Sequence, residues 1–204
     1  MERFPNKQYP NIAGCDEAGR GCLAGPVAAA AVILPGNMET DGINDSKKLS
    51  VNRRNDMAIY TNENGIAWAV GFADADELDK INILQASFLA MHRALDNLSV
   101  VPGLVLVDGN RFKPWGSKPY QCIVGGDAMY AEIAAASILA KTARDEVMEE
   151  ASIKYPGYHW ENNKGYATAG HIEAIGKLGF TPLHRKSFHL KNQLKLNLYP
   201  QNHG

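Results

Sequence analysis

Short apolar runs separated by turns dominate the first third of the chain, and each has the length of a β-strand. They cover residues 12–15, 26–34 and 66–72. Together they favour an antiparallel meander. A polar loop, Asn44–Ser50, follows the second run. A helix is expected after it, over roughly 51–63, with Ser50 as its candidate N-cap.

The middle of the chain changes from strand patterns to a helical periodicity. Apolar residues recur there at alternating spacings of four and three, which places them on one helix face: Leu84, Phe88, Met91, Leu95 and Leu98. Two further short strands are expected at about 104–108 and 120–124. This alternation of helix and strand is typical of an α/β protein.

The last third is helical. A long helix is expected over 131–153, stopped by Pro156 and Gly157, and its small residues near the start allow close packing onto a sheet. A final helix should run from Thr168, a candidate N-cap, to Leu178, with a glycine C-cap at position 179. The whole pattern predicts an α/β fold with a mixed sheet and a helical C-terminal end.

Acidic residues stand where three of the predicted strands end. Asp16 and Glu17 follow the first strand, Asp108 ends the fourth, and Asp127 comes shortly after the fifth. If these strands are neighbours in one sheet, the four carboxylates surround one crevice. Carboxylates at that density raise one another's pKa unless a cation neutralises them. The pattern therefore implies a divalent metal ion, or a pair of them, such as Mg²⁺ or Mn²⁺.

The adjacent pair Asp16 and Glu17 poses a geometric problem. Neighbouring side chains on a regular strand point to opposite faces of the sheet. We therefore expect an irregular strand end at this pair.

A glycine-dense turn with one arginine follows the first acidic pair. Glycines at 19, 21 and 25 let the backbone approach a phosphate closely, and Arg20 adds a cation. A metal-dependent phosphodiester enzyme is the first hypothesis. A dinucleotide-binding turn is the rival, but such a turn leads from a strand directly into a helix. Here Pro26 and Val27 begin another strand, which disfavours the rival.

Composition bounds these hypotheses. The chain has 204 residues, 45% of them hydrophobic, and a formal net charge of −1, which fits one main folded domain with room for a small C-terminal part. The N-terminus lacks the apolar stretch of a signal peptide, and no apolar run approaches the length of a membrane helix. We expect a cytoplasmic protein without a membrane partner.

Cysteine and histidine do not form metal-ligand patterns. The three cysteines have no C-x-x-C spacing, which supports neither a disulfide framework nor a zinc site: Cys15, Cys22 and Cys122. Three histidines are expected at the surface or at helix ends: His92, His171 and His184.

Charge is distributed unevenly, because no acidic residue follows position 176. The basic and aromatic residues of this C-terminal segment are Lys177, Phe180, Arg185, Lys186, Phe188, Lys191, Lys195 and Tyr199. They could form a surface that contacts a nucleic-acid backbone or a solvated tail, and the two interpretations stay open.

Seven motifs in this order resemble a known family, the bacterial ribonucleases HII, which are type 2 ribonucleases H. The resemblance covers roughly residues 10–190. Its motifs are Gly14–Gly21, Asp45–Ser50, Val107–Asn110, Gly126–Ala128, Ala134–Lys141, Lys164–Tyr166 and His184–Phe188. Each motif is weak alone, but the ordered set is specific.

The resemblance implies an RNase H-like fold, with a central mixed five-stranded sheet flanked by helices and a small helical C-terminal subdomain. It also implies one domain with an α/β part at about 10–155, a helical part at about 156–190 and a basic tail at about 191–204. The implied activity is endonucleolytic cutting of RNA in RNA–DNA hybrids and on the 5′ side of single ribonucleotides in duplex DNA. Products would carry 3′-hydroxyl and 5′-phosphate ends, and the role would be ribonucleotide excision repair.

Residue roles follow from the same resemblance. The catalytic, metal-binding residues would be Asp16, Glu17, Asp108 and Asp127, holding two Mg²⁺ or Mn²⁺ ions. The substrate-binding residues would be Gly19, Arg20, Gly21, Ser46, Lys47 and Tyr166, of which Tyr166 would sense the DNA–RNA junction. Two positions depart from the pattern: Cys22 replaces a common proline, which affects turn stiffness, and Met129 replaces a common polar residue, which affects substrate affinity.

Two alternatives stay open. Residues 193–199 resemble short peptides that bind a sliding clamp, although a final segment packed on its own domain is the simpler interpretation. A hybrid-binding module without catalysis is also conceivable, although the intact set of four acids argues against it. A monomer is the default expectation.

Overall fold

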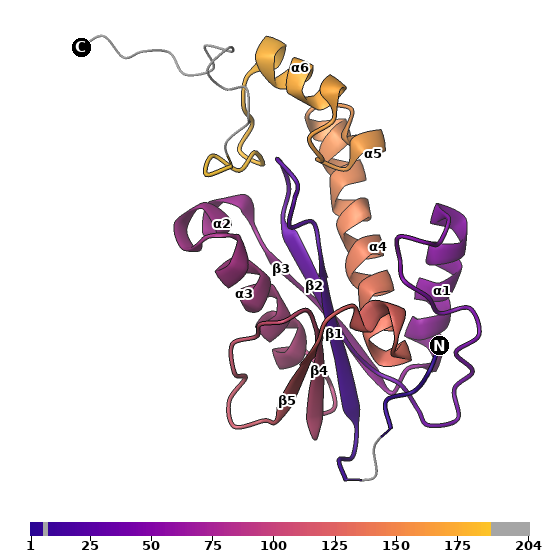
Figure 1. Ribbon diagram of the computed structural model, residues 1–204. Coiled ribbons are helices and arrows are strands. Elements are labelled where there is room, and N and C mark those ends of the chain that lie inside the picture. Colours follow the sequence, from indigo (N-terminus) through magenta and orange to yellow (C-terminus); the bar gives the residue numbers. More distant parts are fainter. Residues whose placement is uncertain (6–7, 189–204) are drawn as a thin grey trace.

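A mixed five-stranded sheet organises the protein, of which the computed structural model describes residues 1–5 and 8–188. The strands are β1 (Ile12–Ala18), β2 (Val27–Ile33), β3 (Ala67–Ala73), β4 (Leu104–Asp108) and β5 (Tyr120–Ile123). Their spatial order is β3-β2-β1-β4-β5, as Figure 1 shows. The first three strands are antiparallel, whereas β4 pairs in parallel with both β1 and β5. The predicted meander and mixed sheet are confirmed.

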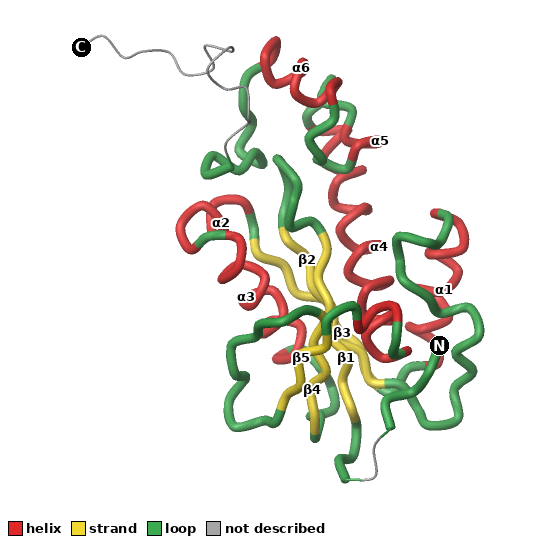
Figure 2. The backbone as a smooth tube through the Cα atoms, in the orientation of Figure 1, coloured by secondary structure: helices red, strands yellow, loops and turns green. Residues whose placement is uncertain are grey.

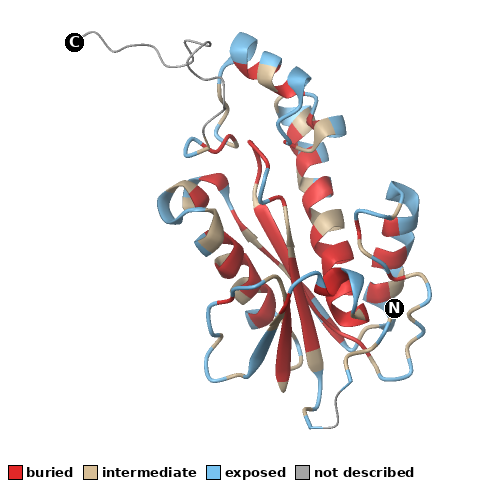
Figure 3. Ribbon diagram, viewed as in Figure 1, coloured by how far each residue is buried: buried red, intermediate tan, exposed pale blue. Residues whose placement is uncertain are grey.

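Helices cover both faces of this sheet. In chain order they are α1 (Val51–Asn64), α2 (Ala75–Ile81), α3 (Ile83–Asp96), the short 3₁₀ helix η1 (Gly126–Ala128), α4 (Ala131–Lys154), α5 (Trp160–Asn163) and α6 (Ala169–Leu178). Helix α3 packs on β2 and β3 from one side, and α4 packs on β1 and β2 from the other, with α1 against α4. The central strands are therefore buried on both faces (Figure 3). Within the described ranges, no helix combines the length and apolarity needed to cross a bilayer.

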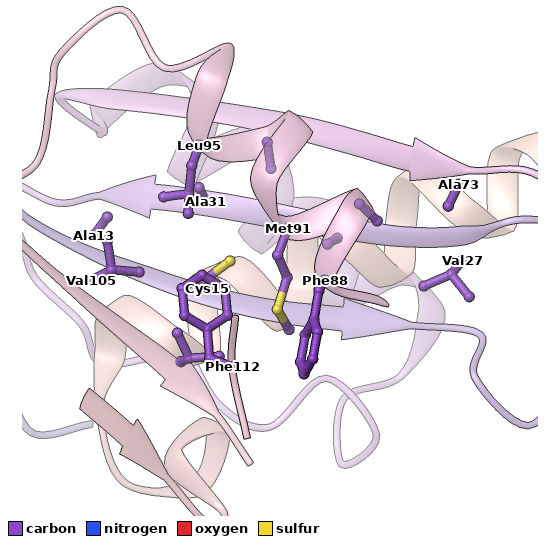
Figure 4. Close-up of a cluster of buried hydrophobic side chains, with 14 of the residues drawn as sticks. Ala13, Cys15, Val27, Ala31, Ala73, Phe88, Met91, Leu95, Val105 and Phe112 are labelled. Atoms are coloured by element: carbon purple, nitrogen blue, oxygen red, sulfur yellow. The ribbon is translucent and has the colours of Figure 1, made fainter. Parts of the chain in front are cut away.

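The core between the sheet and α3 is built from the residues that the periodicity placed on one helix face. Phe88, Met91 and Leu95 contact β1 and β2 through Cys15 and Ala31 (Figure 4). Cys15 is a buried core residue, as expected. Leu98 packs partly against the same cluster but lies beyond the last residue of α3.

The opposite face depends on small residues. A Cβ atom at Gly14 of β1 would overlap the backbone of Glu132 in the first turn of α4. Alanines 134–136 are fully buried against the same face of the sheet. The small residues near the start of α4 thus allow the close approach expected from the sequence, and they bring α4 next to the acidic end of β1.

Several local signals are confirmed by the helix ends. The Ser50 hydroxyl accepts a hydrogen bond from the Arg53 N–H, and the Thr168 hydroxyl accepts one from His171. Gly179 ends α6 with a φ of +81°. Helix α2 was not expected from the sequence; it is separated from α3 at Asn82, whose φ of +69° cannot continue a helix and whose side chain caps α3.

The expected irregular strand end at Asp16 and Glu17 is wrong. Strand β1 stays paired with β2 in unbroken register through Ala18, and Asp16 lies opposite Ala30 and Glu17 opposite Ala29. Only the pairing of β1 with β4 stops earlier, at Cys15. The two carboxylates are accommodated by facing opposite sides of a regular strand.

The C-terminal part packs around Trp160 at the far end of α4, where α5 and α6 gather in Figure 1. His171 and His184 are 0% and 1% exposed in this cluster. The expectation that they lie at the surface is wrong, because each finds hydrogen-bond partners in the interior. His92, in contrast, is partly exposed and contacts the Lys113 carbonyl.

Candidate active site

The topology brings the four predicted carboxylates to one end of the sheet. Asp16 and Glu17 directly precede Ala18, the last residue of β1. Asp108 is the final residue of β4, which runs parallel to β1. Asp127 lies in η1, directly after β5. Carboxyl ends of parallel neighbours meet at the same side of a sheet, so the crevice outside them is the natural place for a site.

Asp16 is held by a chain of hydroxyl groups from the α4 side. Its carboxylate accepts a hydrogen bond from Ser137 of α4, whose oxygen lies 2.9 Å from that of Ser46. The Glu17 N–H also donates to Asp16, at 2.7 Å. Ser46 is 3% exposed, so its hydroxyl faces Ser137 rather than the solvent. Ser137 was not singled out from the sequence, because a serine among alanines in a helix looks like a packing residue.

Glu17 and Asp108 have different surroundings. Glu17 faces the other side of β1, where the Arg20 guanidinium donates to it at 3.1 Å. Asp108 accepts a hydrogen bond from the Gly126 N–H at 2.8 Å. This bond ties the end of β4 to the turn that carries Asp127 and fixes these two acids relative to each other.

Asp127 is 6% exposed and forms an ion pair with Lys47, whose Nζ lies 3.3 Å away. Partial burial opposes protonation of Lys47, but the charges of Asp127 and Asp16 outweigh it and raise the pKa of the amine. Lys47 therefore stays protonated and reaches over the acidic end of the sheet. This places a predicted substrate-binding residue directly beside a predicted metal ligand.

The carboxylates repel one another. Burial, followed by the charges of Glu17 and Asp108, raises the pKa of Asp16 well above its usual range. The pKa values of Glu17 and Asp108 are raised as well, first by burial and then by neighbouring carboxylates, with Arg20 opposing the shift at Glu17. Such an arrangement is relieved by a cation.

The chemistry of this donor set fits a hard divalent ion, since carboxylate oxygens are the ligands that Mg²⁺ and Mn²⁺ prefer. Protein cations already neutralise two of the acids, Arg20 at Glu17 and Lys47 at Asp127. Among residues 1–5 and 8–188, no three acidic, histidine or cysteine side chains are already grouped as ligands of one metal ion. The fit therefore rests on donor type and mutual repulsion.

The loop after β1 is anchored by two buried arginines. Arg185 donates to the carbonyls of Arg20, Gly25 and Pro26 at 2.9–3.1 Å, and Arg144 donates to those of Ala24 and Pro26 at 3.0 Å. In a trans peptide the C=O and N–H point in opposite directions. Because the Arg20 carbonyl is turned inward to Arg185, the Gly21 N–H is directed away from it.

Gly19 is required in this loop for two reasons. Its φ of +90° favours glycine, and a Cβ atom there would overlap the Arg144 side chain. The loop leads from β1 into strand β2, not into a helix, which excludes the dinucleotide-binding interpretation.

Tyr166 lies against this same loop. The Tyr166 hydroxyl and the Cys22 thiol share a hydrogen bond. The Leu23 N–H donates to the carbonyl of Gly165, the residue before Tyr166, at 2.8 Å. The Tyr166 ring is 42% exposed and lies 5.9 Å from the Lys141 ammonium. In Figure 2 the green loop between β1 and β2 reaches toward the loops beside α5 and α6. Tyr166 is therefore an accessible aromatic group joined to the glycine turn.

The described part of the basic C-terminal segment, up to residue 188, does not form one continuous basic surface. Arg185 is 2% exposed and bonded to backbone carbonyls, so it is unavailable to a phosphate, and the interpretation of this residue as part of a basic surface is wrong. Lys177 pairs with Glu173 on the surface of α6. Lys191, Lys195 and the possible clamp-binding residues 193–199 lie outside the described residues. Met129 is 47% exposed.

The family model and the curated relatives described below belong to one family. The model of the family described as Ribonuclease HII matches residues 13–191. The Ribonuclease HII of Parabacteroides distasonis is 57% identical over 178 residues, which are 87% of this chain and 89% of the relative. That of Christiangramia forsetii is 53% identical over 198 residues, which are 97% and 100%. The structure of a PCNA:RNase HII complex from Archaeoglobus fulgidus is similar with a TM-score of 0.75 and 25% identity, covering 89% of this chain and 96% of that one.

Proposed function

The chain belongs to the ribonuclease HII family of nucleases, which cut the RNA strand of RNA–DNA hybrids, and on this premise we propose that it also incises duplex DNA at single embedded ribonucleotides. The cut falls on the 5′ side of the ribonucleotide and leaves 3′-hydroxyl and 5′-phosphate ends. One observation carries this proposal: the four carboxylates lie at the end of the sheet from which the loop joined to Tyr166 departs.

In this proposal Asp16, Glu17, Asp108 and Asp127 hold two Mg²⁺ or Mn²⁺ ions. Two such ions, when bound, activate the attacking water and stabilise the leaving 3′ oxygen. The mutual repulsion of three of the carboxylates supports this assignment, because it favours cation binding.

The neighbouring side chains have supporting roles. Ser137, oriented by Ser46, donates to Asp16; this hydrogen bond favours the ionised form of the buried carboxylate, in opposition to burial, and holds its orientation. Lys47 neutralises Asp127 in the free enzyme and, since its side chain is 76% exposed, can turn to a substrate phosphate. Arg20 has the same relation to Glu17, with half of its side chain exposed. When metal ions bind the carboxylates, Lys47 and Arg20 would leave these acids and pair with substrate phosphates instead.

Recognition of the ribonucleotide is assigned to the glycine turn and Tyr166. The Gly21 N–H, directed away from Arg185, can donate to a phosphate or a 2′-hydroxyl. The 2′-hydroxyl is the group that distinguishes RNA from DNA at one position. The exposed ring of Tyr166 can stack on the sugar that carries it. Loss of either group should harm cutting at an isolated ribonucleotide more than metal binding.

The remaining assignments concern the wider context. We place the enzyme in the cytoplasm as a monomer acting in ribonucleotide excision repair. Contact with a sliding clamp through residues 193–199 belongs to the same proposal, and the archaeal PCNA complex of a similar protein supports it. Deletion of residues 193–204 should abolish clamp binding, and undiminished binding would remove this idea.

Cleavage of end-labelled duplexes tests the proposed function. The substrates are a DNA duplex with one ribonucleotide, the all-DNA duplex and a continuous hybrid, each with Mg²⁺, Mn²⁺ or EDTA. We expect one metal-dependent cut beside the ribonucleotide, fragments from the hybrid and an intact all-DNA control. Binding without any cut under both metals would instead indicate a hybrid-binding module.

A further inference from the structure

Two buried histidines lie behind the loop that carries Tyr166. His171 of α6 and His184 of the C-terminal segment are almost fully buried, and their Nε2 atoms are 3.2 Å apart. Neither histidine is part of the proposed metal site, and neither has a role in the proposed chemistry. A contact between two ring nitrogens is favourable only if one of them donates and the other accepts.

The surrounding donors determine where the protons are. The Thr181 N–H, which can only donate, lies 2.9 Å from His184 Nδ1, so His184 carries its proton on Nε2. The Trp160 indole N–H donates to His171 Nε2 at 3.0 Å, so His171 carries its proton on Nδ1. His184 Nε2–H therefore points to His171 Nε2 and shares the single lone pair of this nitrogen with the Trp160 N–H. His171 Nδ1–H in turn donates to the backbone carbonyl of Tyr166 at 2.9 Å.

This directed chain of hydrogen bonds joins two segments of the site. His184 forms a backbone bridge with Ala24, and its neighbour Leu183 accepts a hydrogen bond from the Gly25 N–H at 2.8 Å. The segment that carries His184 is thus paired with the end of the glycine turn. Through His171, that pairing is extended to the main chain of Tyr166.

The backbone before Tyr166 needs such support. Lys164 and Gly165 both adopt positive φ angles, +48° and +83°, and the first of these is uncommon for a residue with a side chain. The Tyr166 carbonyl accepts hydrogen bonds from both Thr168 and His171. These bonds fix the orientation of the peptide group that directly follows Tyr166, the residue with the half-exposed ring.

We propose that His171 is a positioning residue for Tyr166, and that Trp160 and His184, which both face His171 Nε2, fix the tautomer in which His171 can donate to the Tyr166 carbonyl. The inference rests on the proposed role of Tyr166 at the ribonucleotide. Burial lowers the pKa of both histidines, with that of His184 at about 4, so both rings are neutral near pH 7. The chain of donors is therefore intact under the conditions of the reaction.

Asparagine and glutamine separate positioning from packing. In His171→Asn the amide N–H can replace Nδ1–H and still donate to the Tyr166 carbonyl, whereas the amide of His171→Gln reaches toward the Nε2 position. Both variants lose the ring. If His171 positions Tyr166, kcat/KM at a single ribonucleotide should fall roughly tenfold in His171→Gln, as for one lost hydrogen bond, and less than about threefold in His171→Asn. Equal losses in the two variants would overturn the proposal.

His92 offers a matched control, because its Nε2 lies 2.9 Å from another loop carbonyl, that of Lys113, beside α3. His92→Gln should leave the ratio of junction to continuous-hybrid cleavage unchanged. If the His171 variants do not fold, two His184 variants replace them: His184→Gln keeps a donor near Nε2, whereas His184→Leu leaves His171 Nε2 with the Trp160 N–H, and the loss should be larger in His184→Leu. Thermal unfolding followed by circular dichroism defines the temperature at which all variants are folded.

A double-mutant cycle with Tyr166→Ala gives the decisive test. A residue that acts through Tyr166 has nothing left to position in the Tyr166→Ala background, so His171→Gln should cause less than about a twofold further loss there. Additive losses, with an active wild type, would overturn the positioning role and leave the proposed function standing. A wild type that does not cut at a single ribonucleotide would overturn both.

Discussion

Asp16 illustrates how a buried carboxylate can be prepared for a metal ion by the residues around it. Burial and two nearby acids disfavour its charge, whereas hydrogen bonds from Ser137 and from the Glu17 N–H favour it. The Ser137 hydroxyl is the side-chain group that opposes protonation of Asp16 from the α4 side. The relay from Ser46 to Ser137 therefore helps to set the charge of Asp16.

Removal of that donor should be measurable. In Ser137→Ala, Asp16 loses a hydrogen bond to its charged form, which typically contributes about 1.5–3 kcal/mol. We expect a loss of kcat/KM of at least about tenfold and weaker Mn²⁺ binding. Ser46→Ala, which leaves Ser137 in place, should cost less. Unchanged Mn²⁺ affinity in Ser137→Ala, measured by isothermal titration calorimetry, would contradict this role.

Asp108→Asn should abolish cleavage at saturating Mg²⁺ while the protein stays folded. The pKa of Asp108 is raised by burial and by Asp127, so its ionised form destabilises the metal-free fold at neutral pH. The melting temperature in EDTA should therefore rise in the variant, and the increase on adding Mn²⁺ should shrink. Normal cleavage, or a full metal-induced increase, would overturn the metal assignment.

At the scale of single residues, the sequence could predict groups whose position follows from a strand end, and it could not predict buried polar contacts. The acids at the ends of β1 and β4 and the acid after β5 belong to the first class. Ser137 and Arg185 belong to the second, because a hydroxyl in an alanine-rich helix and an arginine in a basic segment have ordinary interpretations. The partners that change those interpretations are distant in sequence: Asp16 for the serine and Arg20 for the arginine.

At the scale of elements, the contact between α4 and β1 determines the geometry of the site. Helix α4 carries Ser137, β1 carries Asp16, and Gly14 allows the two elements to approach. Any side chain at position 14 must push the start of α4 away from the sheet. The site and the core therefore share one packing requirement.

Gly14→Ala should lower the free energy of unfolding by about 1–3 kcal/mol, the usual cost of overpacking a tight interior. Urea unfolding measures this loss, and activity should fall in parallel because Ser137 moves with α4. Gly36→Ala is the matched control: no atom lies within 4 Å of a Cβ atom built at Gly36, and its stability should be close to wild type. Equal stability of the two variants would contradict the packing argument.

The elements themselves were largely predictable, because each long segment has a clear periodicity and recognisable ends. The failures lie at ends that depend on tertiary partners. Strand β1 continues through Ala18 because β2 pairs with it. Asn82 separates α3 from α2, a helix that the periodicity did not predict, and α5 is only four residues long. Local pattern does not contain that information.

At the scale of the whole molecule, the buried histidine pair should make stability depend on pH. The pKa of His184 falls from 6.5 to about 4 in the folded protein, and that of His171 is also lowered. As the pH falls below 6.5, the unfolded chain binds protons before the folded one, so the free energy of unfolding decreases down to about pH 4. Protonation of the two histidines is thus less favourable in the folded protein than in the unfolded chain.

The raised pKa values of Asp16, Glu17 and Asp108 act in the opposite direction, since those groups take up protons more readily in the folded state. The comparison must therefore be made between proteins. In urea unfolding at pH 7.5 and 5, wild type should lose more stability on acidification than His184→Leu. Identical losses of stability in the two proteins would show that the buried histidines do not make stability depend on pH.

The mixed sheet, its antiparallel meander and the helical C-terminal end could be predicted from the sequence, whereas the position of β4 beside β1 was only a condition of the site prediction. What the sequence could not reveal is how three segments far apart along the chain support one another at the site. The glycine turn after β1, the loop of Tyr166 and the segment of His184 meet through backbone hydrogen bonds. Such pairings leave no periodic signal, so the histidines were mistaken for surface residues.

The most direct test of the account is the chemistry of the ends produced at a single ribonucleotide in duplex DNA. Attack by water on the 5′ side, supported by the four carboxylates, predicts a 3′-hydroxyl on the upstream DNA and a 5′-phosphate on the ribonucleotide. Attack by the ribose 2′-hydroxyl would instead cut on its 3′ side and leave a 2′,3′-cyclic phosphate. Mass spectrometry of the two fragments distinguishes these outcomes. Finding the first pair of ends only with a divalent metal present would support the account, and finding the cyclic phosphate would contradict it.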